Sequence, residues 1–245
     1  MGLFNLFSKE KVLYYPGCLT KGVLKQEFEN YKDVFNILKL DFILLSDSES
    51  CCGLPVFNAG YKKDARKLAK KNFEFFKENG ITKIVTSCPS CYHTFKDVYP
   101  ELVRDWDIEV EHATVTILNA IKKRGIKYMG SEEDRVVVSY HDPCHLGRYS
   151  EIYNEPREII HLLGGKLIEL SFNRENAMCC GAGGGVRANF QEIAKKIAEK
   201  RIAGMSEDVI QILSPCGLCH ANIKTATDKS REFSTFVLGR LRGMR

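Results

Sequence analysis

Residues 47–60, DSESCCGLPVFNAG, place two adjacent cysteines directly before a glycine, and residues 176–185, NAMCCGAGGG, repeat this arrangement. The other six cysteines follow the same repeat. Written as gaps, the first five read C-x32-CC-x35-C-x2-C and the last five read C-x34-CC-x35-C-x2-C. The ten cysteines therefore divide into two sets without remainder: Cys18, Cys51, Cys52, Cys88 and Cys91, and Cys144, Cys179, Cys180, Cys216 and Cys219.

The sequence around the cysteines repeats as well. YYPGCL (14–19) matches YHDPCHL (140–146), and KIVTSCPSC (83–91) matches VIQILSPCGLC (209–219). The offset is 126 residues at the first cysteine and 128 at the other four. Self-similarity at a fixed spacing indicates an internal duplication. We predict two tandem domains, over residues 11–125 and 134–243, joined near residues 122–135.

Short apolar runs and longer amphipathic runs alternate in each half. The short runs predict strands, which are 11–15, 41–45, 83–87, 135–140, 166–170 and 209–213. The longer runs predict helices over 20–39, 61–79, 147–163 and 187–204. This alternation predicts an α/β fold of two duplicated Rossmann-like domains, each a small parallel sheet flanked by helices, related by pseudo-two-fold symmetry. Every cysteine group follows a predicted strand, at the edge where such sheets bind ligands, so five thiols should converge in each half.

The overall composition is that of an ordinary soluble globular protein. The chain has 245 residues, 44% of them hydrophobic and 27% charged. A net charge of +5 is too small to indicate a nucleic-acid partner, and no apolar run reaches the roughly 20 residues that span a bilayer. The initial GLFNLF does not fit a signal peptide, and docks on a partner or packs as a terminus. We expect a cytoplasmic protein that reaches membranes only through partners.

Four kinds of chemistry use cysteines at such spacings. Disulfides are disfavoured because no secretion signal is present and a chain of this size needs no covalent staples. Zinc takes four ligands, whereas each half offers five, so zinc in one or both halves leaves a cysteine over. A redox-active C-x2-C dithiol leaves three cysteines in each half unexplained. We favour iron–sulfur ligation, in which C-x2-C pairs combine with distant thiolates.

Three longer stretches carry a family resemblance: YHDPCHLGR (140–148), NRENAMCCGAGGGVR (173–187) and TSCPSCYHTFK (86–96). With the repeated cysteine pattern, they resemble the CCG, or cysteine-rich, domain family, and most of all the catalytic subunits of heterodisulfide reductase. The resemblance implies two non-cubane [4Fe-4S] clusters, each held by all five cysteines of one half. In some relatives one half holds zinc, so zinc in one half of this chain is a further possibility.

The resemblance also implies a function. It is two-electron reduction of a small anionic disulfide, in anaerobic metabolism, at two clusters that face one cleft. The alternative is an electron-transfer subunit of a lactate, glycolate or glycerol-3-phosphate dehydrogenase. The subunits it resembles also carry ferredoxin-like clusters, but this chain contains no C-x2-C-x2-C-x3-C-P run. We therefore expect electrons from a ferredoxin-like or other donor subunit.

Polar residues beside the cysteines are candidates for catalysis. His145 follows Cys144 and could protonate a departing thiolate, or hydrogen-bond cluster sulfur instead. Arg148 and Arg187 could bind the anionic substrate, or act as solvated charges at helix starts. The same alternatives apply to further residues near the motifs, which are Lys21 for the anion and His93 and His220 for the proton. Structural roles are expected for Asn58, Asp142 and Asn189.

Overall fold

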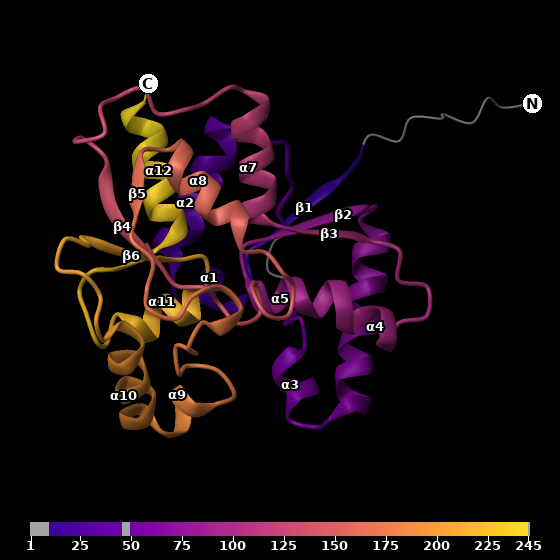
Figure 1. The fold of residues 1–245 in the computed structure, drawn as a ribbon. Coiled ribbons are helices and arrows are strands. Elements are labelled where there is room, and N and C mark those ends of the chain that lie inside the picture. Colours follow the sequence, from indigo (N-terminus) through magenta and orange to yellow (C-terminus); the bar gives the residue numbers. More distant parts are fainter. Residues whose placement is uncertain (1–9, 46–49, 245) are drawn as a thin grey trace, which may run out of the picture.

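The computed structural model describes residues 10–45 and 50–244, and Figure 1 shows its ribbon. The segment GLFNLF (2–7), expected to dock or to form a packed terminus, lies outside the described residues. Among the described residues, no helix is long and apolar enough to cross a lipid bilayer.

The first half alternates strands and helices as the periodicity predicts. Its elements are β1 (Val12–Tyr15), α1 (Cys18–Gly22), α2 (Lys25–Ile37), α3 (Leu54–Asn58), α4 (Lys62–Glu78), β2 (Lys83–Thr86), α5 (Pro89–His93), the π-helical η1 (Thr94–Val98), α6 (Tyr99–Leu102), β3 (Glu109–His112) and α7 (Ala113–Lys123).

The second half repeats this order. Its elements are β4 (Val136–Tyr140), α8 (Asn154–Leu162), β5 (Gly165–Leu167), the 3₁₀ turn η2 (Arg174–Asn176), α9 (Val186–Asn189), α10 (Gln191–Ile202), β6 (Gln211–Ser214), α11 (Gly217–Ile223), β7 (Ser230–Glu232) and α12 (Phe233–Gly243).

Each half forms its own parallel sheet. The first sheet has the order β1-β2-β3, and Ile43 makes an isolated parallel bridge to Leu13 on the free side of β1. The second sheet has the order β5-β4-β6-β7. The Ile43 bridge therefore takes the place of β5, which makes the two strand orders equivalent. The predicted α/β fold with two duplicated parallel sheets is confirmed, whereas the domain boundaries at 11–125 and 134–243 stay a prediction.

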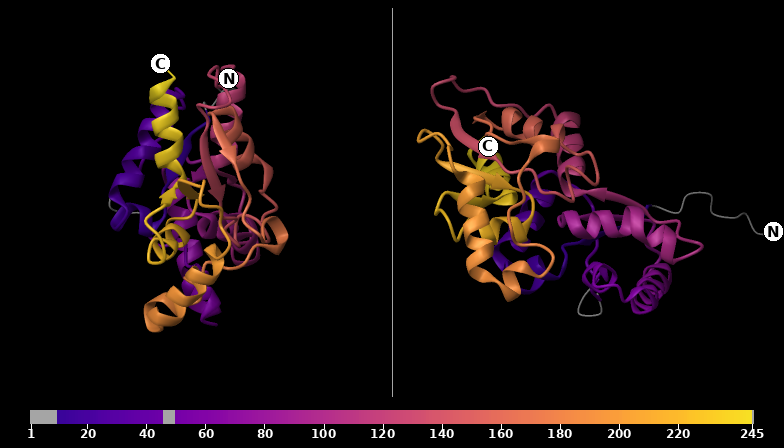
Figure 2. Two further views of the ribbon diagram at one scale, coloured as in Figure 1. Left: turned by 60° about the vertical axis from the view of Figure 1, so that its left-hand side comes forward. Right: turned by 60° about the horizontal axis from the view of Figure 1, so that its bottom comes forward.

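The two halves contact each other through two pairs of helices. The last helix of the first half, α7, packs on α8, the first long helix of the second half. In return α12, the last helix of the second half, packs on α2 of the first (Figures 1 and 2). One apolar core runs through these helices and both sheets, and it contains Tyr14 and Phe35 from one half and Tyr140 and Phe233 from the other. This reciprocal packing has the pseudo-two-fold symmetry that a duplication predicts.

Several predicted elements differ from the structure. The strand predicted over 41–45 is reduced to the single bridge at Ile43. The helix predicted over 147–163 begins only at Asn154, because Glu151 adopts a left-handed backbone conformation with φ 59° that a helix does not accept. The helix predicted over 187–204 breaks at Phe190, with φ −138°. The helix predicted over 20–39 likewise splits into α1 and α2. The non-helical turns keep residues 144–150 close to the carboxyl edge of the second sheet.

Candidate functional site

The first cysteine cluster forms where three loops meet at the carboxyl edge of the first sheet. Cys18 opens α1 after β1, Cys51 and Cys52 precede α3, and Cys88 and Cys91 lie at the start of α5 after β2. Thiol hydrogen bonds connect these residues in the order Cys18, Cys51, Cys52, Cys91, Cys88. The five predicted thiols therefore do converge in this half.

The second cysteine cluster repeats this arrangement. Hydrogen bonds connect its thiols in the equivalent order Cys144, Cys179, Cys180, Cys219, Cys216. All ten cysteines lie within the described residues, and none forms a disulfide. The second cysteine of each C-x2-C pair, which is Cys91 or Cys219, is buried. Cys18 of the first cluster and Cys179 of the second are exposed. Each cluster thus combines an exposed thiol with buried ones.

Glycines allow the loops to approach so closely. Gly17 has φ 82°, and a Cβ there would lie 2.9 Å from the Cβ of Cys88 and 3.3 Å from the Sγ of Cys91. Any side chain would therefore push the first loop away from the C-x2-C helix. In the second cluster the left-handed Gly181 directs its N–H onto the Sγ of Cys179 at 3.4 Å, as Gly53 does for Cys51.

The electrostatics of each cluster favour a bound cation. Hydrogen bonds from Cys18, Cys52 and the Gly53 N–H lower the pKa of Cys51 to about 2, whereas the hydrogen bond to Cys51 helps raise the pKa of Cys52 to about 12. The pKa of Cys88 is lowered as well, whereas the pKa values of Cys18 and Cys91 are raised like that of Cys52. Thiols that ionise easily thus have neighbours that resist ionisation, because adjacent negative charges repel. All five can ionise together only around a positive centre. A soft metal centre supplies that charge, so five converging thiols fit an iron–sulfur cluster in either half.

Histidines that neighbour the two cysteine sets lie in contact where the halves meet. His93, two residues after Cys91, has its ring centroid 5.5 Å from that of His145, which follows Cys144. The His145 ring also stacks on Tyr149 at 5.0 Å, and its Nδ1 lies 3.5 Å from the Sγ of Cys144. Burial and the neighbouring His93 lower the pKa of His145, so its ring is neutral near pH 7. Two imidazoles therefore bridge the loops of the two cysteine clusters.

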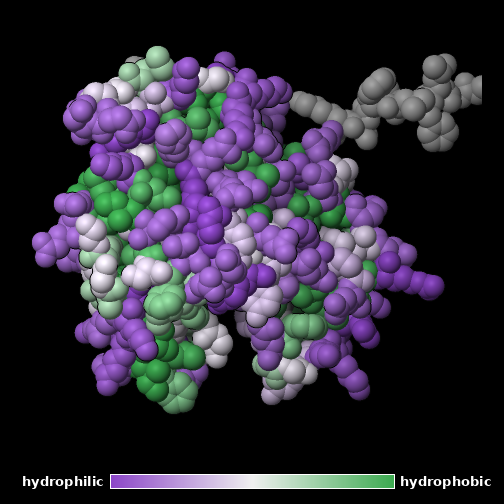
Figure 3. Space-filling model, viewed as in Figure 1, coloured by the Kyte–Doolittle hydropathy of each residue, from purple (hydrophilic) through white to green (hydrophobic). Residues whose placement is uncertain are grey.

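The surface is hollowed on the side of the cysteine loops. Figure 3 shows a notch between the lobe of α3 and α4 and the lobe of α9 and α10. The segment Cys51–Cys52–Gly53 leads directly into α3, and Cys179–Cys180–Gly181 leads through a glycine run towards α9. The notch thus lies between the helices that follow the two vicinal cysteine pairs.

The predicted arginines occupy different positions in this arrangement. Arg148 is exposed, but its Nη1 donates a hydrogen bond of 2.6 Å to the carbonyl of Ala177, two residues before Cys179. Arg187 is half-buried in α9, and among the described residues its guanidinium makes neither a hydrogen bond nor an ion pair. Arg148 therefore supports the loop of the vicinal cysteines. The N–H donors of the Arg187 guanidinium are not used within the described part of the chain. Lys21 lies in the same short helix α1 as Cys18, three residues further along the chain.

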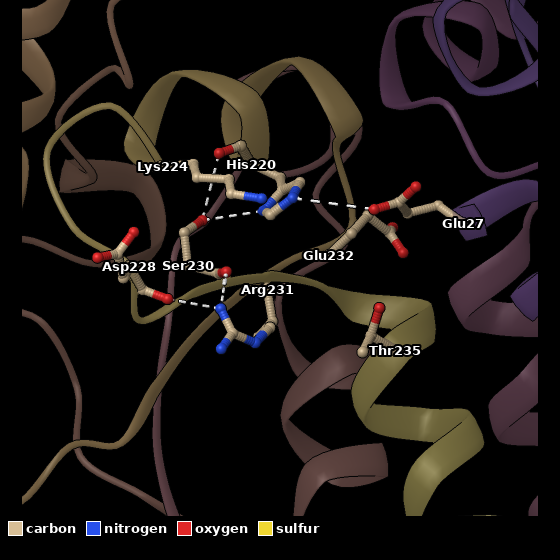
Figure 4. Close-up of a pocket in the computed structure, with 8 residues that line it drawn as sticks. All are labelled: Glu27, His220, Lys224, Asp228, Ser230, Arg231, Glu232 and Thr235. Carbon is tan, nitrogen blue, oxygen red and sulfur yellow. Dashed lines mark hydrogen bonds and ion pairs between the residues drawn. The ribbon is translucent and has the colours of Figure 1, made fainter. Parts of the chain in front are cut away.

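The predicted His220 lies in a separate polar cavity. Figure 4 shows this cavity, of about 360 Å³, which is lined by Glu27, His220, Lys224, Asp228, Ser230, Arg231, Glu232 and Thr235. The Nδ1 of His220 hydrogen-bonds the hydroxyl of Ser230 at 3.0 Å, and its Nε2 faces Glu27 at 3.9 Å. The ring of His220 therefore has partners away from the thiols, which argues against its predicted role as a proton donor there.

Several site residues were missed by the sequence reasoning. His141, three residues before Cys144, is buried, and one of its ring nitrogens lies within 4.8 Å of the Sγ atoms of Cys180 and Cys219. Its Nδ1 accepts a hydrogen bond of 2.9 Å from the Nε of buried Arg201. The signal for His141 was its place in YHDPCHL, one residue after a strand. No signal marked Arg201, which lies on a helix remote from the motifs in sequence.

The structural role expected for Asp142 is supported by its contacts. Its carboxylate forms two hydrogen bonds, of 2.7 and 2.9 Å, with the guanidinium of Arg157, and it accepts the N–H of Arg174. Arg157 pairs in turn with Glu169 at 2.6 Å. Asn189 donates to the carbonyl of Gly185 within its own short helix, and Asn58 ends α3.

The family follows from a comparison with known proteins. Residues 12–96 and 138–224 each match the family model of the cysteine-rich CCG domain. The chain therefore belongs to the CCG family and contains two copies of its domain, which confirms the resemblance seen in the sequence.

The relatives of the chain include redox proteins of several kinds. It is 35% identical over 232 residues to one subunit of the dihydromethanophenazine:CoB–CoM heterodisulfide reductase of Methanosarcina acetivorans, and the match covers 91% of this chain and 56% of that subunit. It is 31% identical to the EtfAB:quinone oxidoreductase of Syntrophomonas wolfei, covering 83% of this chain and 28% of the relative. FadF of Bacillus subtilis, described as a probable iron-sulfur-binding oxidoreductase, is also 31% identical, with 78% and 27% covered. The chain thus spans little more than half the length of the heterodisulfide reductase subunit.

Proposed function

We propose that this chain is an iron–sulfur oxidoreductase module that reduces a small anionic disulfide by two electrons. The observation that carries the proposal is the pair of five-thiol clusters in two equivalent halves, whose neighbouring residues His93 and His145 are in contact. When bound, two non-cubane [4Fe-4S] clusters would supply one electron each, matching the two electrons that cleavage of one disulfide consumes. The similarity to a heterodisulfide reductase subunit supports the disulfide as the substrate class.

The ligand set of each proposed cluster consists of the five cysteines of one half. These are Cys18, Cys51, Cys52, Cys88 and Cys91, and Cys144, Cys179, Cys180, Cys216 and Cys219. The electrons would come from a ferredoxin-like or other donor protein. The cytoplasmic location, the absence of a nucleic-acid partner and zinc in one half stay predictions.

Three side chains have proposed roles in handling the substrate. His145, whose Nδ1 lies 3.5 Å from the Sγ of Cys144, takes up a proton and delivers it to a thiolate formed there. Arg187 binds the anionic group of the disulfide, a role that its unengaged guanidinium supports. Arg148 positions the loop before Cys179 through its hydrogen bond to the carbonyl of Ala177.

The second candidate function is electron relay without disulfide chemistry. The similarity to the EtfAB:quinone oxidoreductase and to FadF favours it, because neither of these proteins is named for a disulfide. A relay needs the two clusters but has no use for an anion site at the notch. Arg187 therefore discriminates between the two candidates.

The first experiment counts iron, acid-labile sulfide and zinc per chain in protein prepared without air. Two [4Fe-4S] clusters require about eight iron and eight sulfide. Cys52→Ser and Cys180→Ser should each remove about half of the iron, since each removes a buried ligand from one half. Stoichiometric zinc without iron would refute the iron–sulfur proposal.

The second experiment tests the substrate. A reduced viologen dye serves as the electron donor, and oxidation of the dye is followed with an anionic and with a neutral disulfide. We expect Arg187→Gln to raise the KM of the anionic disulfide about tenfold or more, since a charge-assisted hydrogen bond contributes about 1.5–3 kcal/mol. The matched control is Arg66→Gln, an exposed arginine on α4. No turnover of any disulfide by an iron-loaded chain would favour the relay.

A further inference from the structure

The two cysteine clusters have the same thiols but different polar neighbours. His141 follows Tyr140 on β4 where Tyr15 follows Tyr14 on β1, so the repeat places a histidine and a tyrosine at equivalent positions. Arg201 of α10 corresponds to Asn72 of α4 in the same way. The buried residues Ala194, Ala198 and Arg201 have the spacing of the buried residues Ala65, Ala69 and Asn72.

The hydrogen bond between Arg201 and His141 fixes the tautomer of the imidazole. An arginine guanidinium only donates hydrogen bonds, so the Nδ1 that receives the Arg201 Nε–H must carry a lone pair. The ring proton is then on Nε2. In the part of the chain that the structure describes, this buried Nε2 has no hydrogen-bond partner, and neither has the Nη2 of Arg201.

This tautomer argues against His141 as a metal ligand. His141, Cys180 and Cys219 lie close enough together to hold a metal ion. A ligating histidine, however, binds the metal through an unprotonated nitrogen and donates its other ring N–H to an acceptor. At His141 the other nitrogen faces a donor, so metal binding through Nε2 would set two N–H groups against each other across 2.9 Å.

We infer that His141 donates its Nε2–H to the thiolates of the second cluster, in a tautomer set by Arg201, and that the second-half centre is therefore reduced more easily than the first. A buried N–H without a partner is destabilising, and thiolates at Cys180 and Cys219 would provide that partner. Hydrogen bonds to the sulfurs of an iron–sulfur centre disperse the charge that reduction adds, which raises its reduction potential. One electron from an added reductant then enters the second-half centre first.

At the two positions equivalent to His141 and Arg201, the first cluster has no such donor among the described residues. The hydroxyl of Tyr15 donates its single proton to the carbonyl of Ser50 at 2.6 Å. The amide of Asn72 donates to the carbonyl of Cys51 and to the hydroxyl of Tyr99, and it carries no charge. Arg201, by contrast, is a buried cation without an ion pair in the described part of the chain, since Asp142 and Glu169 are both hydrogen-bonded to Arg157.

The test measures each centre separately in iron-loaded protein. The Cys52→Ser chain retains the second-half centre and the Cys180→Ser chain retains the first, so a redox titration followed by EPR assigns one midpoint potential to each half. We expect the second-half centre to have the higher potential. Introducing His141→Phe into the Cys52→Ser chain should lower it, and His141→Gln, which again offers an N–H and an acceptor for Arg201, should restore part of the shift. Tyr15→Phe in the Cys180→Ser chain is the matched control and should leave the potential of the first-half centre unchanged.

Pulsed EPR on the wild-type chain with ¹⁵N-labelled histidine tests the donor role without any substitution. A weak coupling that disappears in His141→Phe is expected for an N–H hydrogen-bonded to thiolate. A strong coupling, typical of a directly bound imidazole, would overturn the inference, as would equal potentials of the two centres. The inference rests on the proposed iron–sulfur centres. The metal count distinguishes a failure of the proposed function from a failure of the inference, because zinc without iron refutes the proposed function. In that zinc form ¹⁵N NMR still decides the tautomer, since an Nδ1–H signal from His141 would refute the part assigned to Arg201.

Discussion

Glu232 should make the stability of the protein depend on pH in an unusual direction. This carboxyl lies fully buried at the start of α12, where it receives a hydrogen bond of 2.9 Å from Tyr31 of α2 and one of 2.7 Å from the N–H of Ser234. It also faces Glu27 across the polar cavity of Figure 4. Burial raises the pKa of Glu232 from 4.5 to about 7, although the hydrogen bonds from Ser234 and Tyr31 favour its charged form.

The sign follows from proton binding in the two states. Below pH 4.5 the carboxyl is protonated in both the folded and the unfolded chain, so it does not affect their balance. Between pH 4.5 and 7 the unfolded chain releases the proton and the folded chain retains it, so stability falls as the pH rises. Above pH 7 the loss is complete. A pKa raised by about 2.5 corresponds to about 3 kcal/mol, at about 1.4 kcal/mol for each tenfold change.

The assay is the free energy of unfolding by urea between pH 4 and 8, compared between wild type and Glu232→Gln. The amide cannot ionise, so the difference between the two proteins should change by about 3 kcal/mol across this window, in favour of the variant at high pH. Glu192→Gln, an exposed glutamate in the first turn of α10, is the matched control and should show a flat difference. A flat difference for Glu232→Gln as well would refute the reasoning.

Three further predictions concern the scaffold of the clusters. Gly53 and Gly181 share φ 88°, but only at Gly181 would a Cβ lie 2.7 Å from the Cβ of Ile197; Gly181→Ala should therefore cost about 1–3 kcal/mol more than Gly53→Ala in urea unfolding. Arg157→Met leaves Asp142 buried without its partner and should cost about 3–5 kcal/mol, against less than about 1 kcal/mol for Lys195→Met in the exposed pair with Glu199. Removing the metal with a chelator under reducing conditions should lower the Tm measured by circular dichroism, because thiolates crowded without a cation repel one another; an unchanged Tm would contradict the proposed role of the ten cysteines.

The sequence predicted the strands that precede cysteines but missed those that do not. β3 has the sequence Glu109–His112, and its charged residues conceal the strand from hydrophobic periodicity. The strand forms because it adds to the edge of β2, where Lys83 pairs with Glu109 at 2.8 Å and with Glu111 at 3.7 Å. β7 is likewise short and polar. Edge strands held by a neighbouring strand are a tertiary effect, which local patterns do not report.

The candidate site was predictable to the extent that it is local in sequence. Converging loops follow from cysteines at the carboxyl ends of parallel strands, and this prediction needs only the order of the elements. The polar neighbours of the thiols required the folded structure. Arg201 reaches His141 across 60 residues of sequence, and Asn222 of α11 donates to the carbonyl of Cys180 across 42. Such contacts are set by how the helices pack, and no spacing in the sequence encodes them.

The packing of helices between the two halves affects how the two proposed redox centres could cooperate. Domains joined only by a linker move relative to one another, so the distance between their sites varies. Here α7 packs on α8 of the opposite half and α12 packs on α2. The core that these helices build includes fully buried Tyr14 of β1 and Tyr140 of β4, the strands that precede the first cysteine of each set. Because packed cores resist deformation, the separation of the two clusters is set by side chains of the core rather than by residues 124–135. The two proposed one-electron centres, acting on the same bond, would need such a fixed separation, and the duplicated fold offers it through the shared core.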